Sequence, residues 1–505
     1  MLTPISQIIT HGSFASGWYS FLNDAGSCHQ VQARILENSL KKHPYLKSKK
    51  DFLSLPPAGF DEQISRIQIP HGTRLQPTSG SGHQEKLVPY TKPFLQQLNR
   101  ALNPWLFDMA RSYPGILNGS HYWSISWLPT SWREKGWELD DSELLPSWKK
   151  SFLRNIMAVP SEVSRAETLS ASQFATLAFL AGSHDLSFVS VWSPTFFLNH
   201  LKLLKEWKTE IAATLESGSW QKFKKELSHL KAPRSPVQAK KLTTSGHHDL
   251  WPRLALISSW ASSTSTEWAT ELQENFPGVS FQGKGLWATE GVVTIPFQGK
   301  NILAYQSHFY EFLDPQSGNI LQIENLKEGM EVYPLLTTAN GFARYHMKDR
   351  LVVSGKFKSV PALEFLERED SFDMVGEKLD NKVFLNLHDH LKIEFPDLKW
   401  VIAFAVKDPA MKPYYLFVLE GLGHEASAGK LISGELEGHF HYHLAQELGQ
   451  LGECRVIIRD NSYSLYEKFQ LSRGMVQGNI KVELTHWIKG EKALKLLHEI
   501  FGKIS

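Results

Sequence analysis

The sequence contains few cysteines. Only Cys28 and Cys454 occur among its 505 residues, and two thiols so far apart make neither a disulfide framework nor a zinc-binding spacing. The start, MLTPISQIITHGSF, has no basic segment followed by an apolar run, so we expect no secretory signal. The longest apolar runs, such as WVIAFAV (400–406), are far shorter than the roughly 20 residues that cross a bilayer. We therefore expect a cytoplasmic protein with reduced thiols and no membrane association.

A strong charge of either sign is also absent. The 54 basic and 52 acidic residues leave a formal net charge of +2, which gives no electrostatic reason to expect binding to nucleic acid or to an anionic membrane. The hydrophobic share of 42% and the charged share of 21% are ordinary for a folded protein. At roughly 100–200 residues per domain, the length predicts two or three domains.

Three common catalytic motifs are missing. There is no G-x-S-x-G, as in many serine hydrolases, and no G-x-G-x-x-G after a strand, as in dinucleotide-binding folds. The stretch LQPTSGSGHQEKLVPYT (75–91) has the glycines, hydroxyls and lysine of a phosphate-binding loop. However, Lys86 lies between Glu85 and Leu87, so the P-loop pattern G-x-x-x-x-G-K-[ST] is not met. A polar linker is the alternative interpretation of this loop.

The pattern of apolar residues indicates a mixed α/β protein. Helical spacing from Val31 to Leu40 predicts a helix, and the turn-rich 231–248 predicts a loop. Strand-like runs then follow at 254–260, 292–297 and 351–355. After about residue 370 we expect a separate α+β lobe, with a hairpin formed by WVIAFAV and YYLFVLEG, a helix over about 434–450, and a last helix that includes Trp487 and Ile488.

Two further stretches could carry chemistry. In KGLWATEGVVTIP (284–296), Glu290 could hold magnesium through its carboxylate, and Thr289 could donate to a phosphate oxygen. In GFARYHMKDRLVVSG (341–355), Asp349 directly precedes a strand, where its carboxylate could accept both hydroxyls of a ribose. The alternatives are a solvent-exposed glutamate at a strand edge and an ordinary turn aspartate.

The order and spacing of these stretches resemble the adenylate-forming superfamily. Within it, the sequence is similar to the Gretchen Hagen family of auxin-responsive acyl-acid amido synthetases, and more to its bacterial than its plant branch. The resemblance rests on TSGSGHQEKLVP, SFVSVWSP, QGKGLWATEGVVTIP, GFARYHMKDRLVVSG and MVGEKL. It implies an α/β fold: a large N-terminal domain (1–368) with β-sheets and a β-barrel flanked by helices, which binds ATP and the acyl group, and a small mobile C-terminal lobe (369–505).

The resemblance also implies roles for individual residues. The loop that holds the ATP phosphates would consist of Thr78, Ser79, Gly80, Ser81 and Lys86. The nucleotide would also contact Leu286, Thr289 and Asp349, and the metal would be held by Glu290. The hinge would be formed by Arg368 and Asp370, and the acyl pocket would lie near Ser126, Trp192 and Trp260. Lys481 matches the mobile lysine that reaches the reacting carboxylate. His83 and Lys348 depart from the usual pattern, in which glycine stands at both places.

The resemblance implies an ATP- and Mg²⁺-dependent ligase. A carboxylic acid would attack the α-phosphorus of ATP, and pyrophosphate would leave. An amine, such as that of an amino acid, would then displace AMP and give an amide. Two alternatives stay open: transfer of the acyl group to coenzyme A, and a catalytically silent binding protein, which the departures at His83 and Lys348 would favour.

Overall fold

The computed structural model of the chain describes residues 11–502 with internal gaps. The gaps are 43–45, 47, 78–86, 126, 128–154, 263–264, 369–371, 373, 376, 378, 380, 409–410, 422–424, 448–449, 476 and 481. The described residues form two compact units, with unit 1 running to Leu366 and unit 2 from Glu367 onward. The predicted boundary between an ATP-binding domain and a mobile lobe, at residue 368, stays a prediction about function.

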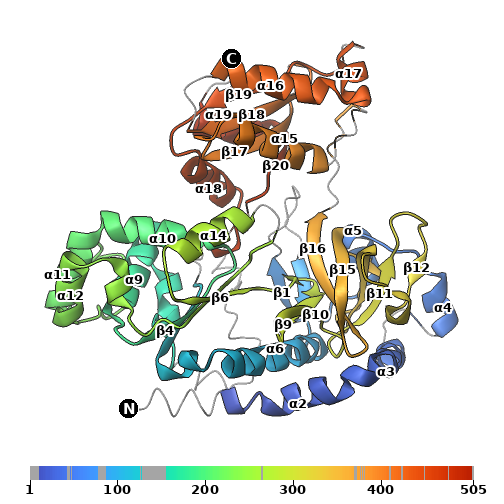
Figure 1. The fold of residues 1–505 in the computed structure, drawn as a ribbon, viewed down its shortest axis with the longest axis horizontal. Helices are drawn as coiled ribbons and strands as arrows, with labels where there is room; N and C mark the ends of the chain where they lie inside the picture. The colour runs from blue at the N-terminus through green and yellow to red at the C-terminus, as the bar shows by residue number, and fades with distance from the viewer. Residues whose placement is uncertain are drawn as a thin grey trace. The chain divides into compact units, whose positions relative to one another are not determined.

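Three helices line one side of unit 1 (Figure 1). They are α2 (Ala15–Asp24), α3 (Cys28–Lys42) and α6 (Lys92–Ser112). Helix α6 begins after Thr91, whose hydroxyl accepts the N–H of Phe94 and so satisfies one of the free donors of the first turn. The indole N–H of Trp18 donates to Asp108 over 2.9 Å and joins α2 to α6. The predicted helix at 31–40 is confirmed as part of α3.

A four-stranded parallel sheet forms one half of unit 1. Its order is β3-β4-β5-β6, with β3 at Ser120–Trp123, β4 at Leu186–Ser190, β5 at Leu256–Ser259 and β6 at Ser280–Gly283. Successive residues of β4 enter different cores. Phe188 packs into the core that contains α6, whereas Val189 packs into a second core. The sheet is therefore buried on both faces, as parallel sheets usually are.

The second core of unit 1 is formed with helices α9–α12 and α14. These are α9 (Leu169–Gly182), α10 (Pro194–Glu206), α11 (Lys208–Ser217), α12 (Pro236–Thr244) and α14 (Thr266–Glu274). The predicted loop at 231–248 is wrong, because α12 lies within it and α13 (His247–Leu250) begins at its end. Pro236 is a turn former in sequence, but at the start of a helix its fixed φ and missing N–H cost nothing.

A curled sheet of eight strands forms the other half of unit 1 (Figure 1). The strands are β9 (Thr294–Phe297), β10 (Lys300–Leu303), β11 (Phe309–Leu313), β12 (Ile320–Leu321), β13 (Glu331–Thr337), β14 (Tyr345–His346), β15 (Asp349–Phe357) and β16 (Val360–Arg368). They follow the order β12-β11-β13-β15-β16-β10-β9, and β14 pairs with β13. The expected barrel is therefore a curled sheet that runs from β12 to β9.

Unit 2 is an α+β lobe built on a four-stranded sheet. Its strands are β17 (Trp400–Lys407), β18 (Tyr414–Glu420), β19 (Arg455–Ile458) and β20 (Thr485–Lys489), in the order β19-β18-β17-β20. The hairpin β17–β18 is antiparallel, as predicted, and the outer strands add in parallel. Its helices are α15 (Asn381–Glu394), α16 (Glu425–Glu437), α17 (Phe440–Glu447), α18 (Ser462–Ser472) and α19 (Glu491–Phe501).

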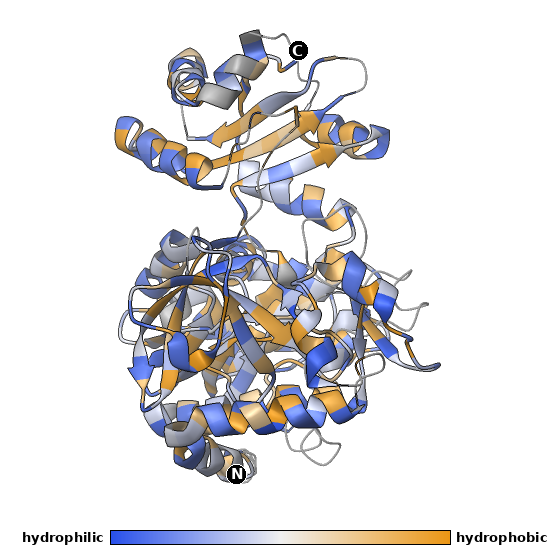
Figure 2. Cartoon of the chain, turned by 90° about the vertical axis from the view of Figure 1, so that its right-hand side faces the viewer, coloured by the Kyte–Doolittle hydropathy of each residue, from blue (hydrophilic) through white to orange (hydrophobic). Residues whose placement is uncertain are grey.

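Apolar residues in unit 2 gather on the strands, while its helices alternate between apolar and polar faces (Figure 2). Two predictions in this unit are wrong. The helix expected over 434–450 is interrupted between α16 and α17, where Gly438 weakens helical structure. Trp487 and Ile488 lie on β20 and not in the last helix, because a short apolar run does not distinguish a strand from a helix. The predicted α+β lobe itself is confirmed.

Among the described residues, every helix is too short or too polar to cross a membrane.

Candidate active site

The predicted phosphate loop connects two strands of a hairpin. Strands β1 (Arg74–Pro77) and β2 (Leu87–Tyr90) are antiparallel, and their last pair is Pro77 with Leu87. The residues on either side of the loop are therefore paired with each other. The predicted residues Thr78, Ser79, Gly80, Ser81 and Lys86, and the divergent His83, lie outside the described residues.

Thr289 and Glu290 form the turn of a second, tighter hairpin. Strand β7 (Trp287–Ala288) pairs with β8 (Gly291–Val292), and the pair Ala288–Gly291 leaves these two residues to make the connection. The hydroxyl of Tyr90, at the end of β2, donates to the carbonyl oxygen of Thr289 over 3.1 Å. The base of the phosphate-loop hairpin therefore lies against the turn that carries Glu290.

The carboxylate of Glu290 is buried, with 8% of the residue exposed. Its Oε1 accepts a hydrogen bond from the hydroxyl of Tyr345 over 2.9 Å. Tyr345 belongs to the R-Y-x-x-x-D stretch that the sequence singled out, at the start of β14. The alternative of a solvent-exposed glutamate is therefore wrong.

A buried histidine fixes the second hairpin. The Nε2 of His308 accepts the backbone N–H of Val292 over 3.2 Å, and its Nδ1–H donates to Oε1 of Gln97 over 3.0 Å. The same Oε1 accepts the N–H of Ala339 over 2.7 Å. Burial, assisted by the charge of Arg100, lowers the pKa of His308 to about 3, so the ring is neutral and can accept at Nε2. This network fixes the strand that follows Glu290.

Gly291 allows this close packing. A Cβ at this position would lie 2.6 Å from Cδ2 of Leu336 and 3.0 Å from Nε2 of His308. The first distance is too short for a Cβ and the second is unusually tight, so a side chain at this position would require Leu336 and His308 to shift. Packing therefore favours the glycine after Glu290.

Arg344 and Asp349, in the stretch 341–355, have different surroundings. Arg344 is buried and makes a two-pronged ion pair with Glu311, with Nε–Oε2 at 2.7 Å and Nη2–Oε1 at 2.9 Å. Its Nη1 donates to the carbonyl oxygens of Leu53 and Leu55, so its role is to hold unit 1 together. Asp349 begins β15 and is only 5% exposed, which contradicts the alternative of an ordinary turn aspartate.

Profiles of one protein family match more than half of the sequence. The GH3 family N-terminal domain matches residues 71–281, and the GH3 family central domain matches residues 301–368. The chain belongs to the GH3 family. The first profile covers the hairpin β1–β2 and the parallel sheet as far as Phe281, and the second covers the part of the curled sheet that carries Tyr345 and Asp349. The hairpin β7–β8 lies between the two matched ranges.

Two solved structures of an acyl acid amido synthetase share the fold at low sequence identity. A GH3.15 acyl acid amido synthetase is 17% identical with a TM-score of 0.75, and the match covers 95% of both chains. The same enzyme in complex with 2,4-DB gives a TM-score of 0.74 at 17% identity, with the same coverage. A 2-hydroxyisobutyryl-CoA ligase with bound 2-HIB-AMP is more distant, with a TM-score of 0.49, 12% identity and coverage of 97% of this chain and 91% of that one. A search of curated protein sequences finds no significant match.

In this GH3 family chain, the residues predicted for the acyl pocket and adenine follow the carboxyl ends of the parallel strands. The N–H of Trp260 donates to the carbonyl oxygen of Trp192 over 3.1 Å, so the two residues are adjacent. The two rings also contact other parts of unit 1. That of Trp192 lies 6.4 Å from Trp287, whereas that of Trp260 packs on Phe365 of β16. Leu286 is buried, and its N–H donates to the hydroxyl of Thr294.

Three other predicted residues lie outside the described part: Ser126 of the acyl pocket, Asp370 of the hinge and the mobile lysine Lys481. Arg368 of the predicted hinge is described. It ends β16, and its carbonyl oxygen accepts from Asn381 over 2.6 Å at the start of α15.

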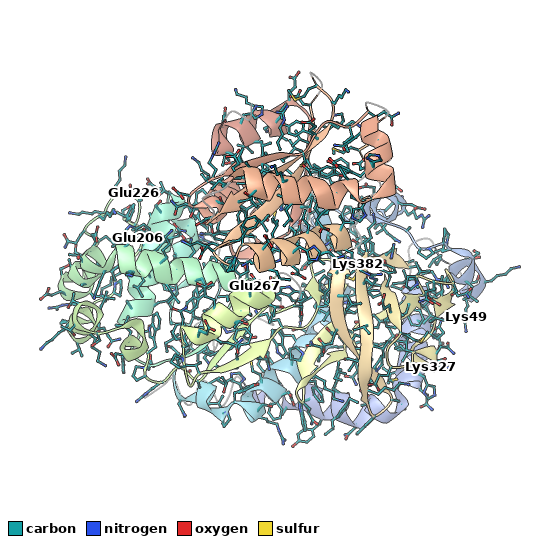
Figure 3. All side chains as sticks on the ribbon, turned by 45° about the horizontal axis from the view of Figure 1, so that its top comes forward. Lys49, Glu206, Glu226, Glu267, Lys327 and Lys382 are labelled. Atoms are coloured by element: carbon teal, nitrogen blue, oxygen red, sulfur yellow. The ribbon has the colours of Figure 1, made fainter. Side chains whose placement is uncertain are left out.

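Several residues of the site were missed from the sequence. Tyr90, Gln97 and His308 are distant in sequence from Glu290, and no local pattern announces their contacts. Lys284 stood in a quoted motif without an assigned role, yet it is buried, at 4% exposed. Ordinary charged residues such as Lys49, Glu206 and Lys327 are exposed at the edges of the molecule (Figure 3). The burial of Lys284 could have been suspected from its position between two glycines, directly before an apolar strand.

Proposed function

We propose that this GH3 family protein is an ATP-dependent ligase that converts a carboxylic acid to an acyl-adenylate and passes the acyl group to an amine. The observation that carries the proposal is the Thr289–Glu290 turn. It is hydrogen-bonded to Tyr90 at the base of the phosphate-loop hairpin and to Tyr345 in the stretch that ends at Asp349. This turn therefore connects the three stretches that the sequence predicts to bind the phosphates, the magnesium ion and the ribose.

ATP would be bound by all three stretches. Backbone and hydroxyl groups of residues 78–81, with the ammonium of Lys86, would hold the phosphates. Thr289 would contact the α-phosphate, Leu286 would lie against adenine, and Asp349 would accept the ribose hydroxyls. Both Glu290 and Asp349 are buried, and each lies in one of the stretches that would contact the nucleotide.

The residues at Glu290 suit a magnesium ion. Magnesium in nucleotide sites is usually held by one or two carboxylates together with substrate phosphates and water. Glu290 supplies one carboxylate, of which Tyr345 occupies only Oε1. Within the described ranges, no group of three or more His, Cys, Asp or Glu side chains forms a metal cage. When bound, magnesium would neutralise charge on the phosphate oxygens.

Activation as an adenylate solves the problem of the leaving group. A free carboxylate would have to expel oxide, whereas an acyl-adenylate expels AMP. Catalysis of the first step would rest on positioning the carboxylate against the α-phosphorus and on nearby cations. For the second step, residues 369–505 would turn at Arg368 and Asp370 and replace Lys481 by the surface that admits the acceptor.

The acceptor is proposed to be an amine, with amino acids as the first candidates. Coenzyme A is the alternative, since the first step would be the same. A cytoplasmic location and membership of the bacterial branch belong to the same proposal, and the free thiols of Cys28 and Cys454 support the former. Product analysis with an amino-acid mixture and with coenzyme A, each added to the preferred acid and ATP, separates the two acceptors.

The proposal is tested by ATP–pyrophosphate exchange with a panel of carboxylic acids. We expect exchange with at least one acid, and a loss of roughly 100-fold in Glu290→Gln, because a group that stabilises the developing phosphate charge is removed. Glu206→Gln, which makes the same change at an exposed position, should exchange at the wild-type rate. The proposal is wrong if no acid supports exchange and Glu290→Gln leaves ATP affinity unchanged.

A further inference from the structure

Arg344 has a backbone conformation that is rare for its residue type. Its φ is +52°, in the left-handed region, where the Cβ of any residue other than glycine crowds the backbone. Among the described residues, the other such positions are Gln298, Lys348, Lys358 and Asn461. Those four are exposed, whereas Arg344 is buried. Strained residues cluster at functional sites, where the surrounding structure holds them, so the surroundings of Arg344 need an explanation.

Contacts to both the side chain and the backbone of Arg344 hold this conformation. The guanidinium pairs with both carboxylate oxygens of Glu311, at 2.7 and 2.9 Å, and lies 4.7 Å from the ring centroid of Phe52. The backbone N–H donates to Oγ1 of Thr337 over 3.1 Å, and the carbonyl oxygen accepts the N–H of Ala58 over 3.1 Å. The ion pair is buried, so moving the arginine would leave an uncompensated charge inside the protein.

Two adjacent rows of paired residues cross strands β11, β13 and β14. They are Tyr310, Leu336 and Tyr345 in one row and Glu311, Leu335 and His346 in the other. Successive residues of a strand point to opposite faces, so the two rows lie on opposite faces of the sheet. The row of Tyr345 faces the hairpin that carries Glu290, whereas the other row contains the ion-pair partner of Arg344.

The hydroxyls of both tyrosines contact the hairpin that carries Glu290. Tyr310 donates to the carbonyl oxygen of Val292 over 2.6 Å, and Tyr345 donates to Oε1 of Glu290 over 2.9 Å. Strand β14 is only two residues long and begins directly after Arg344. A shift of one residue in so short a strand would turn Tyr345 to the opposite face. The direction in which the chain leaves Arg344 therefore decides whether Tyr345 reaches Glu290.

We propose that Arg344, besides holding unit 1 together, is a positioning residue of the ligase. Its ion pair with Glu311 holds the left-handed backbone that directs Tyr345 to Glu290, and thereby orients the carboxylate that would bind magnesium. The inference rests on the proposed function, because it concerns the metal of that site. The ion pair lies on the other face of the sheet from Tyr345, so it acts through the backbone and makes no direct contact with the reacting groups.

The test separates the backbone of Arg344 from its charge. The double variants Arg344→Gly/Glu311→Gln and Arg344→Ala/Glu311→Gln both remove the ion pair without leaving a buried charge unpaired. Only glycine adopts the left-handed conformation without strain, so the glycine double variant should need magnesium within about twofold of the wild type for half-maximal ATP–pyrophosphate exchange. The alanine double variant should need at least about fivefold more, because that conformation is disfavoured for alanine by about this factor.

Melting temperatures give a second readout that needs no catalysis. Adding Tyr345→Phe should lower the melting temperature of the wild type and of the glycine double variant, because each then loses the hydrogen bond to Glu290. It should leave the alanine double variant almost unchanged, because its Tyr345 no longer reaches Glu290. The proposal is overturned if Tyr345→Phe causes equal losses in all three proteins, or if the glycine and alanine double variants have the same magnesium dependence.

Two further comparisons keep the test decisive. Glu311→Gln alone should raise the magnesium requirement, and adding Arg344→Gly should restore it, so the proposal can be judged even if the alanine double variant does not fold. Lys358, with a φ of +54°, is an exposed left-handed residue in the turn between β15 and β16. Lys358→Gly should be more stable than Lys358→Ala, and both should show the magnesium dependence of the wild type. A raised magnesium requirement in Lys358→Ala would indicate general destabilisation and overturn the proposal.

The failure of this inference differs from the failure of the proposed function. Exchange activity with the same magnesium dependence in the glycine and alanine double variants would support the ligase and overturn the role of Arg344. A loss of melting temperature on Tyr345→Phe that occurs in the glycine double variant but not in the alanine double variant, without exchange for any acid, would show that Arg344 directs Tyr345 and would overturn the ligase.

Discussion

Tyr345 is in direct contact with Glu290, the residue proposed to hold magnesium. Its phenol donates to Glu290 over 2.9 Å, and its strand, β14, lies against β13 on one side and bridges to Ala58 on the other. The backbone N–H of His346 donates to the carbonyl oxygen of Ala58 and fixes the tyrosine in place. We infer that Tyr345 is a positioning residue that orients the carboxylate of Glu290.

Replacing Tyr345 by phenylalanine removes one hydroxyl and little else. A hydrogen bond to a charged group contributes roughly 1.5–3 kcal/mol, so we expect kcat/KM for ATP–pyrophosphate exchange to fall about tenfold to 100-fold. The magnesium concentration that gives half-maximal rate should also rise, because the carboxylate is less well oriented. Tyr19→Phe, at a residue that is 53% exposed, serves as the control.

A purely structural role for Tyr345 predicts another result. The variant would then lose melting temperature in proportion to its loss of activity, and its magnesium dependence would match that of the wild type. That outcome would contradict the positioning role, even if activity fell.

The helix α6 connects the two hairpins of the site. Thr91 at its start follows β2, and Gln97 in its second turn accepts from His308 and Ala339. Through His308 the helix holds Val292, and through Trp105 it reaches Gln282 of the parallel sheet. One amphipathic helix thus fixes the position of β8 relative to the strands that precede Lys284.

Gln97→Leu tests this connection. It would leave the buried Nδ1–H of His308 and the partly buried N–H of Ala339 without an acceptor, at a cost of roughly 1–3 kcal/mol each. We expect the free energy of unfolding of unit 1 to fall by about 2–5 kcal/mol and exchange activity to fall with it. The measurement is denaturant unfolding followed by tryptophan fluorescence. Gln96→Leu, on the exposed face of the same helix, should change stability by less than about 0.5 kcal/mol, and an equal loss in both variants would contradict the connection.

Elements were predictable from sequence where one local signal dominates. The apolar runs of β17 and β18, separated by the turn formers of KDPAMKP, could only be a hairpin. By contrast, Trp487 and Ile488 belong to a strand because β17 offers them a parallel partner, which no local pattern contains. The Thr289–Glu290 turn could be recognised from the motif A-T-E that contains it. Tyr90 and His308 contact this hairpin only because the tertiary fold brings distant segments together.

At the scale of the whole chain, the pattern of apolar residues indicated a mixed α/β protein, whereas the β-sheets and barrel of a large N-terminal domain were expected only from the resemblance. Turn formers at Pro236 suggested a loop, and the fold uses them to start a helix. Buried charge was also hidden from the sequence. Glu290, Lys284 and the pair Arg344–Glu311 are ordinary in composition, and only the packing of distant segments removes them from water. Their burial could not be read from local hydropathy.

Buried histidines make the two units unequally sensitive to acid. In unit 1, burial lowers the pKa of His11 and His200 to about 4, and that of His121 and His308 to about 3, with the neighbouring His11 adding to the shift of His121. Among the described residues of unit 2, only His486 has so low a histidine pKa, about 3, again chiefly because of burial. In the unfolded chain, each titrates near 6.5.

Stability should therefore fall as the pH falls below about 6.5, because the unfolded chain then binds protons that the folded units cannot. Each such histidine contributes a slope of about 1.4 kcal/mol per pH unit below that point. Unit 1, whose described part holds four such residues, should lose stability more steeply than unit 2. Between pH 7 and 5.5 most carboxylates stay ionised, so this interval isolates the histidines.

Scanning calorimetry at pH 7.0 and 5.5 measures the difference. Because the two units need not unfold as one, each transition is followed separately, and His200→Gln assigns the transition of unit 1. That variant should also reduce the pH-dependent shift of unit 1 by about one quarter, since one of four equivalent proton sites is removed. Transitions that shift equally with pH, or a shift that His200→Gln leaves unchanged, would show that acid acts on the protein through other groups.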